Sequence, residues 1–192
     1  MQTIGFVGAG NMACALGGGI SGQSDGQVQV CATDPIAEAG ERFCAETGGT
    51  FHANLAELMA KADVLVLAVK PQVLPDILSE VRGLVTSAPL VVSIAAGISL
   101  ATLTEGLGRE ARVIRAMPNT PALVRRGVTV LVRGGAATAE DLALVERLFG
   151  SVGRVLTTAK ESELDAVTAI SGSGPGFLFA YAEAMVAAGV AA

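Results

Sequence analysis

The chain of 192 residues is long enough for one full domain, or for one domain and part of another. Hydrophobic residues make up 51% of it, but only 4% are aromatic and none is Trp, so Val, Leu, Ile and Ala must build the core. The net charge of −5 provides no broad positive field, and we therefore expect neither a nucleic acid nor an anionic membrane surface as a partner.

The three cysteines and the single histidine argue against a metal centre. Cys14, Cys31 and Cys44 form no CxxC pair, and with His52 as the only histidine we predict incidental or buried thiols and no metal site.

The first residues show no basic region followed by an apolar run, and no uncharged stretch approaches the roughly 20 apolar residues of a membrane span. We expect no membrane segment and, by default, a cytoplasmic location.

Six apolar runs of strand length alternate with segments of helical character. This alternation predicts an α/β fold with an open, mainly parallel sheet. The predicted strands are Thr3–Val7, Val28–Ala32, Val64–Val69, Leu90–Ile94, Arg112–Ala116 and Val128–Val132, and the predicted helices are Ile36–Thr47, Asn54–Lys61, Pro71–Val85 and Ala139–Phe149.

The first predicted strand runs directly into Gly8-Ala9-Gly10-Asn11-Met12-Ala13, the GxGxxA form of the dinucleotide-binding fingerprint. Gly8 permits a tight turn, and Gly10 lets the backbone approach a pyrophosphate at the start of the next helix. The alternative is a plain Gly-rich connection. The run Gly17–Gly19 is unfavourable inside a helix, so we expect it to mark a close crossing or the helix end.

Two charged residues follow predicted strands. Asp34 comes after the second strand, where a carboxylate accepts hydrogen bonds from a ribose diol and repels a ribose phosphate, which favours NADH. The alternative is an ordinary Asp-Pro turn. Lys70 ends the third strand at the edge where ligands of such sheets bind, near a cofactor phosphate or ribose or a substrate carboxylate; the alternative is a solvated lysine.

Three later segments have polar or small residues where a ligand would lie. Asn119 and Thr120 stand between two prolines that stiffen a loop directly after a strand, although a Pro-stabilised turn has the same pattern. Ser171 and Ser173 belong to SGSGP, which suits a carboxylate or another anion at a helix start, or only caps that helix. The small residues of SIAAG let a flat ring approach the backbone, or simply pack.

Acidic and polar residues replace the apolar strands near Thr157–Leu164. We therefore divide the chain into a dinucleotide-binding domain, residues 1–158, and the beginning of a helical domain, residues 159–192. There a Gly/Ser turn, with Pro175 at the first helical position, leads into a helix that is apolar nearly all round and has Glu183 as its only charge. Such a helix needs other helices against it, so we expect a partner subunit or a truncated sequence.

In order along the chain, GFVGAGNMA, AVKPQ, SIAAGIS, RAMPNTPALV and DAVTAISGSGPG resemble the motifs of pyrroline-5-carboxylate reductases. The resemblance implies a Rossmann-type domain followed by an all-α dimerisation domain, and a homodimer or higher homo-oligomer formed through the C-terminal helices. It also implies that NADPH or NADH reduces the small molecule 1-pyrroline-5-carboxylate to L-proline, the last step of proline biosynthesis.

The resemblance also implies the site residues. It places Asp34 and Asn54 toward the adenosine, and it assigns no proton donor. Gly176 stands where the family usually has Ala, and the family's later Gly/Thr-rich loop, which binds the substrate carboxylate across the dimer, is not in this sequence. The implied cofactor contacts are Val7, Gly8, Ala9, Gly10, Asn11, Met12, Asp34, Asn54, Ala68, Val69, Lys70 and Ala96, and the pocket residues are Asn119, Thr120, Ser171 and Ser173.

Two other interpretations stay open at this point. One is a truncated, catalytically silent nucleotide-binding module, and the other is a related Rossmann reductase that acts on another imine or a hydroxy acid. A Ser/His/Asp hydrolase is not plausible with one histidine, and the sequence has no GxxxxGK[ST] loop for a nucleotide triphosphate.

Overall fold

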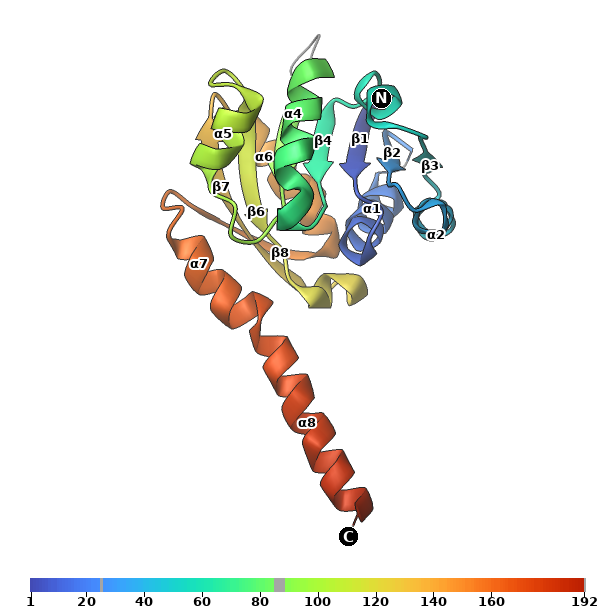
Figure 1. The fold of residues 1–192 in the computed structure, drawn as a ribbon, viewed down its shortest axis with the longest axis vertical. Coiled ribbons are helices and arrows are strands. Elements are labelled where there is room, and N and C mark those ends of the chain that lie inside the picture. The colour runs from blue at the N-terminus through green and yellow to red at the C-terminus, as the bar shows by residue number, and fades with distance from the viewer. Residues whose placement is uncertain (25, 85–88, 192) are drawn as a thin grey trace.

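A computed structural model describes residues 1–24, 26–84 and 89–191. Within them, eight strands form one sheet in the order β3-β2-β1-β4-β5-β6-β7-β8, and every neighbouring pair is parallel except β6 with β7 (Figure 1). The mainly parallel α/β fold predicted from the sequence is confirmed. The strands are β1 (Gln2–Val7), β2 (Val28–Thr33), β3 (Thr50–Phe51), β4 (Val64–Leu67), β5 (Leu90–Ser93), β6 (Arg112–Met117), β7 (Gly127–Gly135) and β8 (Gly153–Thr158).

Helices cover both faces of this sheet. The apolar sides of α1, α2 and α6 pack on one face, and those of α3, α4 and α5 pack on the other. The helices are α1 (Asn11–Gln23), α2 (Ala37–Thr47), α3 (Leu55–Met59), α4 (Leu74–Leu84), α5 (Leu100–Leu107), α6 (Ala139–Phe149), α7 (Glu163–Val167) and α8 (Gly174–Ala191), with short turns η1 (Pro71–Val73), η2 (Thr120–Val124), η3 (Gly150–Val152) and η4 (Thr168–Gly172).

Side chains of the central strands alternate between the two core layers. In β4, Val64 and Val66 belong to the layer under α1 and α6, whereas Leu65 and Leu67 belong to the layer under α3, α4 and α5. Burial on both faces explains why this strand is a continuous apolar run rather than an alternating pattern. The strand is shorter than predicted, because it ends two residues before Val69.

The predicted helix over 71–85 begins as the 3₁₀ turn η1 and continues as α4 to Leu84. The proline at the start of η1 fits this position, because its missing N–H leaves no helical bond unmade there. Val85, the last residue of the predicted helix, lies outside the described residues.

The glycine run of α1 marks a close crossing. A Cβ on Gly17 would lie 3.0 Å from the Thr47 Cγ2 of α2, and a Cβ on Gly19 would lie 2.4 Å from the Val152 Cγ1 of η3. Because the helix continues to Gln23, the alternative prediction of a helix end at this run is wrong.

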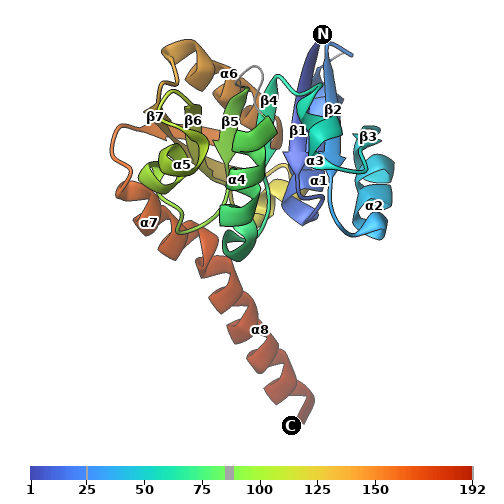
Figure 2. The ribbon, with the colours of Figure 1, turned by 45° about the horizontal axis from the view of Figure 1, so that its top comes forward.

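The C-terminal segment extends away from the sheet. α7, the π-helical turn η4 and α8 run on as one helical stretch, Glu163–Ala191, and α8 leaves the body on the side to which the arrowheads of β1 and β4 point (Figures 1 and 2). The predicted Gly/Ser turn is therefore wrong, because Ser171 lies inside η4. Pro175 is the second rather than the first residue of α8.

No residue of α8 is buried within the described chain. By length and apolar composition alone, Glu163–Ala191 is a candidate for a membrane span. The expectation that no stretch approaches the length and apolar character of a membrane span is therefore wrong for this helix. The same apolar surface also suits contact with other helices, since a helix apolar all round needs a covering of some kind.

Candidate dinucleotide-binding site

The carboxyl ends of β1, β2 and β4 lie side by side. Val7 pairs with Thr33 on one side and with Leu67 on the other. The Gly8 N–H donates to the Thr33 carbonyl at 2.8 Å, and the Ala68 N–H donates to the Val7 carbonyl at 2.8 Å. The sheet order reverses between β1 and β4, and ligands of open α/β sheets bind in the crevice at such a point.

Two glycines of the fingerprint shape the turn between β1 and α1. Gly8 has a φ of +97°, and a Cβ there would lie 2.7 Å from the Ala68 carbonyl oxygen, so only glycine fits without strain. Gly10 has an ordinary φ of −73°, and a Cβ there would meet no atom within 4 Å. The space beside Gly10 is open, which fits the close approach of a pyrophosphate.

The first turn of α1 is free to bind an anion. Gly10 is the N-cap residue and no side chain caps the helix there. The first N–H groups of a helix have no partner within it, and they form the positive end of the helix dipole. In a helix of 13 residues that begins at a sheet crevice, this geometry suits phosphate.

A cleft of about 670 Å³ opens at this edge, a size typical of small-molecule sites. Eight of the twelve implied cofactor contacts line it. These are Val7, Gly8, Gly10, Asp34, Asn54, Ala68, Val69 and Lys70.

The other four implied contacts do not line this cleft. Ala9 is fully buried behind the turn, and Asn11 is exposed at the first position of α1. Met12 is partly buried and packs against the core, and Ala96 lies in the turn after β5. Asn11 can still contribute its backbone N–H, since it follows Gly10, whereas the Ala9 N–H is bound to Asp34.

Asp34 forms the Asp-Pro turn and also lines the cleft. Its Oδ1 accepts a hydrogen bond from the Ile36 N–H at 2.9 Å, which makes the Asp-Pro turn. Its Oδ2 accepts one from the Ala9 N–H at 2.8 Å, which ties the end of β2 to the glycine turn. The carboxylate is thereby held at the wall of the cleft.

Asn54 and Lys70 differ in how they are engaged. Asn54 caps α3, because its Oδ1 accepts from the Glu57 N–H at 2.9 Å, while its Nδ2 donates to the Glu57 carboxylate at 3.0 Å. The Lys70 ammonium forms no ion pair within the described part of the chain and is exposed beside the cleft. It is available to an anionic ligand.

Sequence reasoning missed half of the lining. Ile36 and Val73 are exposed apolar side chains, 59% and 46% accessible, where polar ones would be usual in loops. Both residues follow a turn that ends a strand, Asp-Pro or Lys-Pro, and an apolar residue at such a place is a sequence signal for the wall of a ligand cleft. The cleft residues not singled out from the sequence are Thr33, Pro35, Ile36, Ala53, Leu55, Val73, Ile77 and Glu80.

The proline-framed loop meets the C-terminal helical segment. The Asn119 Nδ2 donates to the Ser171 Oγ at 2.8 Å, while its Oδ1 accepts from the Val128 N–H at 2.9 Å. Two of the four implied pocket residues are thus brought together. Thr120 begins η2 and Ser173 directly follows η4, and both are exposed.

A buried ion pair anchors the same segment. Arg115 of β6 is 4% exposed, and its Nη1 lies 2.8 Å from the Glu161 Oε1. Its Nη2 lies 3.6 Å from Asp165, just inside α7. Together with the bond between Asn119 and Ser171, this pair fixes where the helical segment leaves the sheet.

Two of the three thiols, those of Cys14 and Cys31, are buried. Burial raises the pKa of Cys14, whose Sγ donates to the Ala9 carbonyl behind the turn, and burial raises the pKa of Cys31 to about 11. All three cysteines are free. Within residues 1–24, 26–84 and 89–191, no group of three or more His, Cys, Asp or Glu side chains could hold a metal ion.

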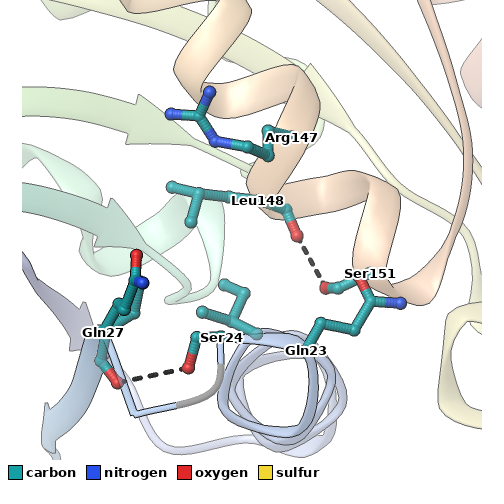
Figure 3. A pocket seen from close by; sticks show the side chains of 8 residues that line it. Gln23, Ser24, Gln27, Arg147, Leu148 and Ser151 are labelled. Atoms are coloured by element: carbon teal, nitrogen blue, oxygen red, sulfur yellow. Dashed lines mark hydrogen bonds between the residues drawn. The ribbon is translucent and has the colours of Figure 1, made fainter.

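A second hollow, of about 260 Å³, lies at the opposite edge of the sheet, between the end of α1 and α6 (Figure 3). The Ser24 hydroxyl donates to the carbonyls of Ser21 and Val28, and the Ser151 hydroxyl donates to the Leu148 carbonyl. These hydroxyls are used within the protein, and the end of α1 presents carbonyls rather than N–H groups. We therefore place the candidate site at the first cleft.

The fold and the cleft are those of a Rossmann-type dinucleotide-binding protein. Residues 3–97 match the family model described as NADP oxidoreductase coenzyme F420-dependent, and residues 161–192 match the one described as pyrroline-5-carboxylate reductase dimerisation. The pyrroline-5-carboxylate reductase of Pseudomonas aeruginosa is 41% identical over 186 residues, which cover 97% of this chain and 68% of that protein. The chain belongs to the pyrroline-5-carboxylate reductase family.

Solved structures of pyrroline-5-carboxylate reductases are similar to this chain over nearly its whole length. The reductase of Coxiella burnetii has a TM-score of 0.85 and 32% identity, covering 97% of this chain and 69% of its own. The Plasmodium falciparum enzyme, solved with NADP bound, has a TM-score of 0.84 and 29% identity, covering 98% of this chain and 69% of its own. Residues 161–192, which match a dimerisation family, include the whole of α8, so its apolar surface suits contact with another protein chain.

Proposed function

We propose that this protein reduces 1-pyrroline-5-carboxylate to L-proline with NADPH or NADH, the last step of proline biosynthesis. One observation carries the proposal: in a chain 41% identical to such a reductase, the Gly8–Gly10 turn opens on a cleft at the sheet's switch point. The two other interpretations considered from the sequence have no comparable support.

The cofactor fits the residues present. The open position at Gly10 and the uncapped start of α1 suit the pyrophosphate, with backbone groups from Val7 to Met12 around it. Asp34 and Asn54 lie on the adenosine side. Ala68, Val69 and Lys70, with Ala96 in the turn after β5, lie along the remainder.

When bound, the reduced nicotinamide supplies the hydride that converts the C=N carbon of the substrate to C–H. The protein's own part is to orient the two reactants, since proximity and alignment provide most of the acceleration in such a transfer. Asn119, Thr120, Ser171 and Ser173 border the substrate on the side away from the adenosine. We assign no proton donor among them.

We also propose that the working form is a homodimer built through α8, with the division between the two domains after Thr158, where β8 ends. The large apolar side chains of α8 are exposed in the single chain, among them Phe177 at 76% and Leu178 at 63%. A second copy would cover them. We place the protein in the cytoplasm, in line with its three free thiols.

The test follows the absorbance of the reduced nicotinamide with 1-pyrroline-5-carboxylate as substrate and the dimeric chain as enzyme. We expect turnover that depends on the imine, with little or none on a 2-hydroxy acid in the reverse direction. Replacing Asn119 by Ala frees Ser171 and should lower kcat/KM at least about tenfold. Absence of turnover by the dimeric chain would contradict the proposal.

A further inference from the structure

We infer that Asp34 makes this protein select NADH over NADPH, and this inference rests on the proposed function. The two cofactors differ in one group, the phosphate on the adenosine ribose. That group would lie beside the end of β2, where Asp34 lines the cleft.

The carboxylate cannot turn away from an incoming phosphate. One of its oxygens accepts the Ala9 N–H at 2.8 Å and the other accepts the Ile36 N–H at 2.9 Å. Both contacts are to backbone, so the negative charge stays fixed at the cleft wall. Each oxygen retains a further lone pair, which can accept from the two hydroxyls of an unmodified ribose.

The residues after Asp34 provide no compensating donors within the cleft. Pro35 has no N–H, and the Ile36 N–H is already bound to Asp34. The next N–H groups are those of Ala37 and Glu38, which do not line the cleft.

The nearby cations are placed elsewhere. The Arg42 Nη2 donates to the Ala9 carbonyl at 3.3 Å, and Arg42 is absent from the cleft lining. Lys70 lines the cleft from the end of β4, on the other side of β1 from Asp34. A ribose phosphate beside Asp34 therefore meets a like charge, and no described residue places a cation opposite it.

The test measures dissociation constants for NADH and NADPH from the fluorescence of the bound reduced nicotinamide, at one fixed ionic strength. We expect NADH to bind at least about tenfold more tightly than NADPH, and the difference to shrink as salt is added. In Asp34→Ser, which keeps a hydroxyl for the Ala9 N–H but removes the charge, we expect tighter NADPH binding and a ratio near one.

Glu38→Gln is the matched control, because it removes a neighbouring negative charge outside the cleft and should leave the ratio nearly unchanged. Thermal unfolding of each variant checks the fold. Equal or tighter binding of NADPH by the parent chain would overturn the inference, as would an unchanged ratio in Asp34→Ser. If NADPH binding is tight and is lost in Arg42→Gln, Arg42 holds the phosphate and the inference is also overturned. Absence of binding of both cofactors would instead contradict the proposed function.

Discussion

Gly8 and Gly10 are two residues apart, yet they are glycine for different reasons. Gly8 is required by the backbone, since its φ of +97° and the Ala68 carbonyl 2.7 Å from a Cβ leave no room for another residue. At Gly10 the fold itself tolerates a side chain, because nothing lies within 4 Å of a Cβ. The constraint there comes from the ligand.

Replacing Gly10 by Val therefore separates binding from folding. We expect the melting temperature to change by less than about 2 °C, whereas the affinity for NADH falls at least about tenfold because the side chain fills the pyrophosphate position. Calorimetry of both variants checks this. Gly8→Ala should instead lose stability, by about 1–3 kcal/mol. A Gly10→Val variant that binds NADH like the parent would mean that the pyrophosphate does not pass this residue.

His52 provides a pH-dependent contribution to stability. Burial lowers its pKa, the Lys61 charge acts in the same direction, and Glu57, 3.8 Å away, acts weakly against them. Its Nε2 is buried, with no hydrogen-bond partner in the part of the chain that the structure describes. The unfolded chain therefore binds a proton at this residue at higher pH than the folded chain does.

It follows that the free energy of unfolding decreases as the pH falls below about 6.5, the ordinary pKa of histidine. We expect urea denaturation to show this loss between about pH 7.5 and about pH 5.5, and a smaller loss in His52→Asn. An equal loss in the variant would assign the effect to other groups.

Asp34 shows what sequence reasoning could and could not settle at this scale. Its position after an apolar strand was sufficient to predict a residue at the ligand edge. The sequence offered a ribose contact and an Asp-Pro turn as alternatives, but the carboxylate has two oxygens, and the turn uses only one of them. The bond to the Ala9 N–H joins residues 25 apart, and local pattern does not reveal such a contact.

At the scale of elements, the strands that the sequence predicts are apolar and mostly buried. The missed strands lack that signal. β3 has only two residues, Thr50 and Phe51, and β8 is an edge strand whose side chains are mostly partly or fully exposed. The missed helix α5 contains two threonines and a glycine, all weak helix formers, and it depends on the Ser99 cap and on Leu103 packing into the core.

The crossing of α1 with η3 gives a quantitative test of packing. Gly19→Ala places a Cβ 2.4 Å from Val152 and 2.8 Å from the Ser151 hydroxyl, so we expect a loss of about 1–3 kcal/mol in unfolding free energy. Gly83→Ala in α4 is the control. Among the described residues nothing lies within 4 Å of a Cβ at this position, so the change should stabilise the protein by about 0.5–1 kcal/mol. Equal effects of both changes would contradict the close crossing.

At the scale of the whole molecule, α8 carries many of the large apolar side chains that are exposed among the described residues. The sequence predicted its apolar circumference correctly, but not that the helix continues from Glu163 through a π-helical turn. Side chains that suit both a subunit interface and a lipid environment cannot be told apart by composition. The match to a dimerisation family favours the interface.

A charge within this surface should prevent assembly. We expect Leu178→Glu to shift the protein to monomers in analytical ultracentrifugation, at concentrations where the parent chain is dimeric, because the carboxylate would be buried without a partner. Leu156→Glu on β8, at a leucine that is 50% exposed outside α8, should leave the dimer intact. Dimers of unchanged stability in Leu178→Glu would mean that α8 is not the interface.

The central claim is that the turn between β1 and α1 holds a nicotinamide dinucleotide. Amide hydrogen exchange of the dimeric chain with and without NADH tests both the binding and its place. We predict protection over residues 8–13 and 68–70, the two sides of the cleft, with no change over 23–24, 27–28 and 147–151, which contribute to the second hollow. Protection confined to the second hollow, or none at all with saturating NADH, would contradict the claim.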